Sequence, residues 1–164
     1  VQYAYDNGLM TGVSATEFAP EATTTRAMIV SMLARLEGVT SAEDAGFSDV
    51  SDGDWYVTAV NWAAAEGIIS GTGDGNFSPN TAITREQLAA MLMNYAAWKG
   101  EDVSARADLS GYNDAASVSS WAAETVQWAV AEGLISGMPG NLLKPRGSAT
   151  RAQVAAILER FLEQ

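Results

Sequence analysis

Apolar side chains recur along much of this chain with the period of buried helices. Around residues 54–66 one face of the expected helix carries Trp55, Ala59, Trp62 and Ala63. Other apolar residues fill much of the opposite side, and a helix that is apolar nearly all round is buried by several neighbours. The segment 120–132 has the same character. The pattern therefore predicts helices near 54–66 and 120–132, packed together in a central bundle. Their candidate N-caps are Ser51, Asp54, Ser119 and Ser120.

A second helix is predicted to begin at each of three Thr-Arg pairs. The threonines, which are suitable N-caps, are Thr25, Thr84 and Thr150. Three residues later Gln87 and Gln153 complete a capping box, whereas Met28 cannot. Gly67 and Gly133 lie where a left-handed residue ends the first helix of a unit. The pattern thus predicts helix-loop-helix units and no confident strand.

The same motifs recur three times in the same order, which indicates a triplicated unit. Residues that keep the two intervals of 59 and 66 include Arg26, Arg85, Arg151, Gly12, Gly71, Gly137, Pro20, Pro79 and Pro145. We assign the units to residues 1–40, 41–100 and 101–164. Linkers are expected near 39–46 and 100–111.

The first unit lacks the segment that opens the other two. Phe-Ser-Asp-Val at 47–50 and Tyr-Asn-Asp-Ala at 112–115 are each followed by a tryptophan, Trp55 or Trp121. We expect both tryptophans to lie in the core. Val1 aligns with the interior of a helix, so we expect a fragment of a longer protein in which the first unit is truncated.

The composition excludes several classes of function. The 164 residues carry a net charge of −11 and include no His and no Cys. Nucleophiles and metal sites that depend on these residues are excluded, as are disulfides, and we expect no metal and no cofactor. The acidic charge argues against nucleic acid and anionic lipid as partners. No apolar run approaches the roughly 20 residues of a membrane span. We expect no catalytic role for Asp49 and Asp114, whose favoured roles are turns or caps, and no enzyme.

These motifs resemble the S-layer homology domain family. Its pattern of Phe-x-Asp-Val, Trp, a Gly-Ile/Leu-x-x-Gly turn, aromatic-x-Pro and Thr-Arg-Ala-Glu runs through 47–87 and 112–153, and in truncated form through 1–28. The resemblance implies an all-α, pseudo-threefold assembly with grooves between units, at the extracellular surface, cell wall or S-layer. It also implies non-covalent anchoring of a larger surface protein to secondary cell-wall polysaccharide, often through a pyruvate ketal on an amino sugar. Departures from the final Ala-Glu are Met28, Glu86, Gln87 and Gln153.

Arg26, Arg85 and Arg151 are the main candidate ligand-binding residues. Each occupies the first helical position, where the helix dipole disfavours a cation by about 0.3–1 kcal/mol, so another group must compensate. A guanidinium and free helix N–H groups can together bind a carboxylate, such as that of a pyruvate ketal. The alternative is an arginine that pairs with Asp49, Asp114 or backbone carbonyls and locks units together. With the resemblance, we favour the anion site.

Further candidate ligand residues are Tyr3, Trp62, Trp128, Ser70, Ser136 and Lys144. The aromatic rings are possible platforms for a pyranose, although packing in the core is favoured from the sequence alone. The serine hydroxyls are possible partners of sugar hydroxyls, although a turn role is favoured. The lysine adds positive charge near the third Thr-Arg pair. Its alternative role is that of a solvated loop residue. The leading hypothesis is a non-catalytic carbohydrate-binding anchor. Its alternative is a protein–protein assembly module that has lost sugar binding.

Overall fold

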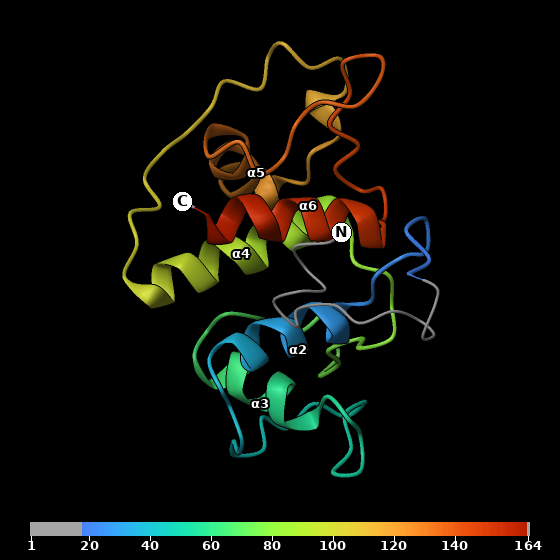
Figure 1. The fold of residues 1–164 in the computed structure, drawn as a ribbon, viewed down its shortest axis with the longest axis vertical. Coiled ribbons are helices and arrows are strands. Elements are labelled where there is room, and N and C mark those ends of the chain that lie inside the picture. Colours follow the sequence, from blue (N-terminus) through green and yellow to red (C-terminus); the bar gives the residue numbers. More distant parts are fainter. Residues whose placement is uncertain (1–17, 164) are drawn as a thin grey trace.

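The computed structural model describes residues 18–163, in which helices are joined by long loops and no strand is present among the described residues. In chain order the elements are α2 (Arg26–Leu36), α3 (Val57–Ala65), α4 (Arg85–Lys99), the short 3-10 helices η1 (Ala115–Ser117) and η2 (Ser120–Ala122), α5 (Ala123–Ala131) and α6 (Arg151–Leu162) (Figure 1). The all-α prediction is confirmed. Within residues 18–163, no helix combines the length and the apolar character needed to cross a bilayer.

The three helices predicted at the Thr-Arg pairs are confirmed to the residue. Thr25 caps α2, where its side chain accepts a hydrogen bond from the Met28 backbone. Both predicted capping boxes are present, at the start of α4 and of α6. In each, the threonine hydroxyl accepts from the third helical N–H, and the glutamine side chain accepts from the threonine N–H. These local bonds explain why the helices begin there.

The predicted first helices of the units exist, but they begin later than expected. α3 starts at Val57 and α5 at Ala123, and neither has a side-chain N-cap bond. The capping predictions are therefore wrong: Asp54 accepts from the Ser51 N–H in the preceding turn, at 2.8 Å. The predicted ends are confirmed by the left-handed Gly67 and Gly133, with φ of 70° and 68°.

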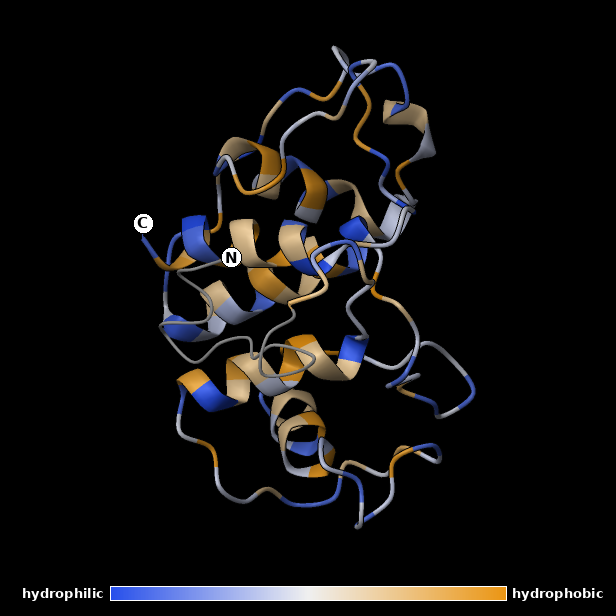
Figure 2. Ribbon diagram, turned by 45° about the vertical axis from the view of Figure 1, so that its right-hand side comes forward, coloured by the Kyte–Doolittle hydropathy of each residue, from blue (hydrophilic) through white to orange (hydrophobic). Residues whose placement is uncertain are grey.

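The prediction that α3 and its counterpart α5 form the centre is wrong. α3 packs against α2, and α5 packs against α4. In Figure 1 these two helices lie toward opposite ends of the molecule, with α2, α4 and α6 between them. The apolar residues of the central helices, orange in Figure 2, pack into one core. Thus α2 of the first unit is covered by α3 of the second unit, and α4 of the second unit is covered by α5 of the third.

A closed ring of backbone hydrogen bonds joins the three units at the starts of α2, α4 and α6. Its donors and acceptors are the residues just before the cap threonines: Thr24, Ile83 and Ala149. The N–H of Ile83 donates to the carbonyl of Thr24 at 2.8 Å, that of Ala149 to Ile83 at 2.9 Å, and that of Thr24 to Ala149 at 3.1 Å. All three residues are fully buried. Each unit therefore bonds to the other two, as a pseudo-threefold arrangement requires.

Candidate functional site

The three arginines are buried and tie each unit to the next. Arg26, only 4% exposed, donates from Nε to the Phe77 carbonyl at 2.8 Å and from Nη2 to the Ser70 carbonyl at 3.1 Å. Its guanidinium also lies over the Phe77 ring, 4.6 Å from the centroid. The acceptors belong to the loop of the second unit. Arg26 therefore holds that loop against the start of α2.

Arg85 and Arg151 repeat this arrangement around the ring. Arg85 donates from Nε to the Leu143 carbonyl at 2.8 Å and from Nη2 to the Ser136 carbonyl at 3.0 Å. Arg151 donates from Nε to the Phe18 carbonyl at 2.8 Å, which returns to the first unit. The sequence left two roles open for these arginines, an anion site or a contact that locks units together. Bonds to backbone carbonyls of another unit, which lock the units together, are present at all three positions.

The first helical N–H groups are not free to bind a carboxylate, so that part of the anion-site prediction is wrong. The N–H of Arg26 donates to the Thr81 carbonyl at 3.0 Å, and that of Ala27 to Pro79 at 2.9 Å. α4 and α6 have the same pair of bonds, to 145–147 and to 20–22 respectively. These carbonyls satisfy the orphan donors of each helix start. They also offset the unfavourable placement of a cation there.

Burial lowers the pKa of Arg26 from its ordinary value, while the Asp49 carboxylate raises it. Burial likewise lowers the pKa of Arg85, opposed by Asp114. An arginine keeps its proton across the physiological range even after such a shift, because its ordinary pKa lies above 12. The two guanidinium groups therefore remain cations in a largely enclosed setting.

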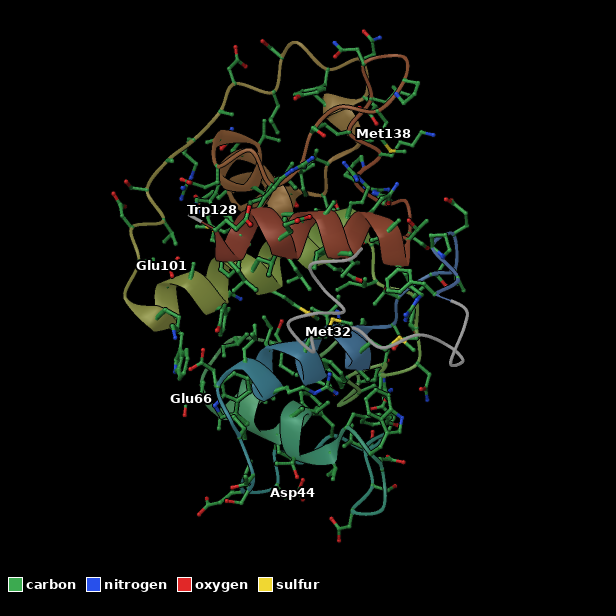
Figure 3. The ribbon with its side chains drawn as sticks, viewed as in Figure 1. Met32, Asp44, Glu66, Glu101, Trp128 and Met138 are labelled. Atoms are coloured by element: carbon green, nitrogen blue, oxygen red, sulfur yellow. The ribbon has the colours of Figure 1, made fainter. Side chains whose placement is uncertain are left out.

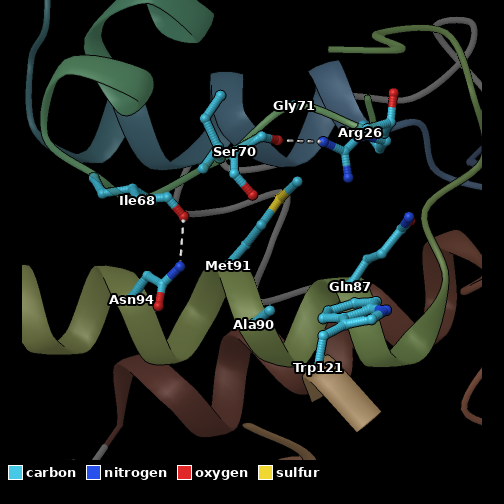
Figure 4. Close-up of a pocket in the computed structure, with 11 residues that line it drawn as sticks. Arg26, Ile68, Ser70, Gly71, Gln87, Ala90, Met91, Asn94 and Trp121 are labelled. Carbon is cyan, nitrogen blue, oxygen red and sulfur yellow. Dashed lines mark hydrogen bonds between the residues drawn. The ribbon is translucent and has the colours of Figure 1, made fainter. Parts of the chain in front are cut away.

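A pocket of about 400 Å³ opens beside Arg26, between the loop at 68–72 and α4. Figure 4 shows Arg26, Ser70 and Gly71 on one side, with Gln87, Asn94 and Trp121 facing them. All three units contribute: Arg26 comes from the first, the loop and α4 from the second, and Trp121 from the third. The remaining lining residues are Ile68, Ile69, Thr72, Ala90 and Met91. This pocket is an inter-unit groove of the kind that the resemblance implies.

The loop side of this pocket presents unused donors. Within the described part of the chain, the N–H groups of Ser70 and Gly71 have no hydrogen-bond acceptor, and neither does Nη1 of Arg26. Backbone N–H groups and a guanidinium each donate hydrogen bonds to anions, so these unused donors are candidate partners of a carboxylate. On the opposite wall, Asn94 donates from Nδ2 to the Ile68 carbonyl at 3.1 Å, which leaves its Oδ1 as an acceptor.

Asp49 and Asp114 fix the loops against which the arginines pack, through bonds to residues 28–30 positions away and not through the local turn or cap predicted for them. Both oxygens of Asp49 accept backbone N–H bonds, from Phe77 and Ser78, at 2.8 Å. Ser78 has a left-handed φ of 58°, a conformation that costs a non-glycine residue roughly 1–2 kcal/mol. Asp114 makes the same pair of bonds to Leu143 and Lys144, at 2.7 and 2.8 Å. The carboxylates thus stabilise a strained turn.

We expect Asp114→Asn to lower the free energy of unfolding by about 1–2 kcal/mol at pH 7, because the amide has one acceptor oxygen and so can accept only one of the two backbone N–H bonds. Burial raises the pKa of Asp114, but the N–H groups of Leu143 and Lys144 and the charge of Arg85 bring it below its ordinary value. A lowered folded-state pKa stabilises the protein above the unfolded-state pKa, about 3.9, and this contribution disappears as the pH falls through the folded-state value.

The difference between Asp114→Asn and the unmodified chain should therefore shrink below about pH 4. Urea denaturation at pH 7, 5 and 3 measures it. Asp74→Asn is the control, because it removes the same charge from an exposed loop position. A stability difference that stayed constant down to pH 3, or equal losses of stability in both variants, would contradict the role of Asp114 in fixing this loop.

The two tryptophans considered as ligand residues are buried, and the two predicted to lie in the core are exposed. Trp62 and Trp128 are 8% and 2% exposed, and Trp128 packs on Phe161 with ring centroids 6.5 Å apart (Figure 3). They are core residues and offer no open ring face to a sugar. Trp55 and Trp121 are 66% and 58% exposed, so their predicted core position is wrong. The reason is that both lie before the start of their helix, where the helical period does not apply.

The other candidates divide between loop and surface. Ser70 lines the pocket, and its carbonyl binds Arg26. The favoured turn bond of the serine hydroxyl is absent from both Ser70 and Ser136, since no described group bonds either hydroxyl. Lys144 is exposed and does not line this pocket. Tyr3 lies outside the described residues.

Sequence reasoning missed four lining residues that can contact a ligand: Trp121, Asn94, Gln87 and Gly71. The signal for Trp121 was its place just after a turn rather than within a helix. Asn94 gave no signal, because its partner is a backbone carbonyl. Among residues 18–163, no group of three or more His, Cys, Asp or Glu side chains is placed to hold a metal ion.

Comparison with known proteins settles which family has this architecture. The profile of the S-layer homology domain matches residues 1–27, 46–89 and 111–155, most of the chain. The chain belongs to the S-layer homology domain family. The three matches correspond to the three units that the ring of backbone hydrogen bonds joins, so the triplication inferred from the spacing is a series of three family repeats.

Several curated relatives share this S-layer homology region. The chain is 37% identical over 161 residues to an exoglucanase XynX of Acetivibrio thermocellus, covering 95% of the chain but 14% of that protein. It is 31% identical to a surface-layer 125 kDa protein of Lysinibacillus sphaericus, covering 99% of the chain and 14% of the relative. A cellulosome-anchoring protein of A. thermocellus is 29% identical over 90% of the chain and 34% of its own length.

The chain therefore spans a small part of each of these relatives. The enzyme names belong to long proteins of which only the S-layer homology region is matched. The match therefore transfers none of the catalytic activities in those names to this chain. What the relatives share with it is the repeated helical unit.

Proposed function

We propose that this chain is a non-catalytic cell-wall anchoring module of a larger surface protein. In this proposal it binds a carboxylate-bearing sugar, a pyruvylated amino sugar of secondary cell-wall polysaccharide, in the pocket beside Arg26. Membership of the S-layer homology family supports a place at the cell surface or cell wall. Relatives named as surface-layer, cell-surface and cellulosome-anchoring proteins support it further.

The observation that carries this proposal is the set of unused donors at the loop wall of the pocket. The N–H groups of Ser70 and Gly71 and the free Nη1 of Arg26 can surround a single carboxylate. A hydrogen bond to a charged oxygen is about twice as strong as a neutral one, and a partly enclosed site strengthens it. This arrangement replaces the helix N–H groups expected from the sequence as the partners of Arg26.

The opposite wall suits the body of a sugar. The exposed ring of Trp121 can pack on the apolar face of a pyranose. The free Oδ1 of Asn94 can accept from a sugar hydroxyl, and Nε2 of Gln87 can donate to one, because only Oε1 of Gln87 is used in the capping box. The pocket therefore combines anion recognition with a neutral, partly aromatic surface.

The departure from the family glutamate does not weaken this proposal. Gln87 and Gln153 both complete capping boxes through their side-chain oxygens. An amide oxygen accepts the cap N–H as a carboxylate oxygen does. The helix start that positions the pocket wall is therefore intact, so the missing glutamate does not favour an assembly module without sugar binding.

Calorimetric titration with a pyruvylated amino-sugar monosaccharide tests the proposal. We expect the same sugar without its pyruvate to bind at least about tenfold more weakly, because it lacks the carboxylate. Trp121→Ala should weaken binding about tenfold, the equivalent of about 1.4 kcal/mol of stacking. The matched control Trp55→Ala removes an equally exposed indole that does not line this pocket and should change the affinity less than about twofold.

Two results would contradict the proposal. One is equal affinity for the sugar with and without its pyruvate, which would show that the donors at Ser70 and Gly71 do not recognise a carboxylate. The other is no measurable binding by the folded, unmodified chain. Circular dichroism of every variant establishes that the comparison is made between folded proteins.

A further inference from the structure

A buried carboxylate lies at the start of α4, at a position where the other two units have alanine. Glu86 is the second helical residue and is only 4% exposed. Ala27 and Ala152 occupy the equivalent places in α2 and α6. A buried carboxylate needs hydrogen-bond donors, and a surface role does not explain this residue. Its contacts show what it holds.

Both oxygens of Glu86 accept hydrogen bonds from one residue of the third unit. The backbone N–H of Ser119 donates to Oε2 at 3.0 Å, and its hydroxyl donates to Oε1 at 2.8 Å. Ser119 is the N-terminal flanking residue of η2, the short helix that contains Trp121. Glu86 therefore fastens the first turn of α4 to the turn that carries the exposed indole.

The backbone on both sides of Trp121 is held in place against α4. Ala122 is fully buried, η2 packs against α4, and the Ala122 N–H donates back to the Ser119 carbonyl at 2.9 Å. Trp121 lies between these two fixed residues and projects to the pocket wall beside Gln87 and Ala90 (Figure 4). Fixing both flanks of a surface residue reduces the conformational entropy that it must lose when a ligand binds.

The equivalent tryptophan of the second unit has no such attachment. Gly53 lies two residues before Trp55, as Ser119 lies two residues before Trp121, and Ala27 stands in place of Glu86. Glycine has no hydroxyl and alanine has no acceptor, so this pair cannot bond through side chains. Both members of the Glu86–Ser119 pair thus occur together at the boundary between the second and third units and are both missing between the first and second.

We infer that Glu86 is a positioning residue that holds Trp121 over the pocket through Ser119 and so presets the sugar-binding wall of this groove. The inference rests on the proposed function for its consequence in binding, but the positioning itself is a property of the free protein. Trp121 is the platform that touches the sugar. Glu86 acts only through the turn that carries it.

Fluorine NMR of chain labelled with 5-fluorotryptophan tests the positioning without any ligand. Trp121→Phe and Trp55→Phe identify the signals of these two residues among those of the five tryptophans. In Glu86→Ala, which installs the alanine of the other units, we expect the Trp121 signal to move toward that of free fluorotryptophan while the Trp55 signal stays in place. Ser119→Ala, which keeps the N–H and loses the hydroxyl, should move the Trp121 signal part of the way. Glu86→Gln, which keeps an acceptor, should restore most of the original position.

The same variants are then titrated with the pyruvylated amino-sugar monosaccharide, and Glu86→Ala is expected to bind about fivefold more weakly. An unchanged Trp121 signal in folded Glu86→Ala and Ser119→Ala would overturn the inference. So would equal movement of the Trp55 signal, which would indicate a general loss of structure. If the Trp121 signal moves as expected but the unmodified chain binds no sugar, the positioning stands and the proposed function fails.

Discussion

Replacement of Arg26 by alanine is expected to lower the free energy of unfolding by about 3 kcal/mol. The variant leaves the carbonyls of Phe77 and Ser70 without their charged donor and removes the cation from the face of the Phe77 ring. Bonds from a charged group contribute about 1.5–3 kcal/mol each, and an unsatisfied buried acceptor adds a desolvation cost. In a domain of this size the melting temperature should fall by about 6–12 °C.

Arg106→Ala is the matched control for this experiment. Arg106 lies near the surface, where it faces Glu124 at 3.6 Å and donates from Nη1 to the carbonyls of Val103 and Ala105 in bonds open to solvent. Such solvent-exposed local contacts contribute little, so the variant should stay within about 0.5 kcal/mol of the unmodified chain. Denaturation by urea, followed by circular dichroism, compares the two. Similar small losses in both variants would contradict the structural role of Arg26.

This expectation changes how a loss of binding at Arg26 must be interpreted. The same guanidinium closes the inter-unit contact and lines the pocket. Loss of sugar binding in Arg26→Ala therefore combines the loss of one ligand contact with a displaced loop. Changes on the opposite wall, at Trp121, separate recognition from folding.

Gly71→Ala is expected to cost about 2–3 kcal/mol of stability and to abolish binding in the pocket. A β-carbon at Gly71 would lie 2.7 Å from the backbone oxygen of Asn76 and 3.2 Å from Cε1 of Phe47. The backbone oxygen cannot move aside without breaking its bond with the Thr72 N–H, at 2.8 Å. The loop must therefore shift, and its shift displaces the N–H groups proposed to bind the carboxylate.

Gly53→Ala is the corresponding control, because a β-carbon there meets nothing within 4 Å and the residue does not have a positive φ. We expect it to remain within about 0.5 kcal/mol of the unmodified chain and to keep its affinity for the sugar. Thermal denaturation and the sugar titration measure both properties. A Gly71→Ala protein with unchanged stability would show that the loop tolerates the added atom, contrary to this account.

Features set by short-range chemistry could be predicted from the sequence. The threonine caps, the two capping boxes and the glycine helix ends each involve residues only a few positions apart. Such bonds form whenever the local backbone is helical, so their residue types are visible in the sequence. The triplication was visible for the same reason, as equal spacing of those local signals.

Features that depend on long-range partners could not be predicted. Arg26 bonds to backbone carbonyls 44 and 51 residues away, and every residue type has a carbonyl, so no side chain marks the acceptor. The packing of α3 on α2 was hidden because α3 is apolar around most of its surface. Trp55 and Trp121 were placed in the core because the helical period was extended past the true helix starts at Val57 and Ala123.

The return of Arg151 to Phe18 also has a consequence for how this architecture can change in copy number. In an open solenoid, one more repeat adds to an end, and special terminal repeats protect the exposed face. Here the third unit bonds back to the first, so neither end of the series offers a vacant position. A single duplicated unit would find the arginine and the loop of every existing unit already paired. Longer versions of this architecture are therefore expected to grow by whole triplets.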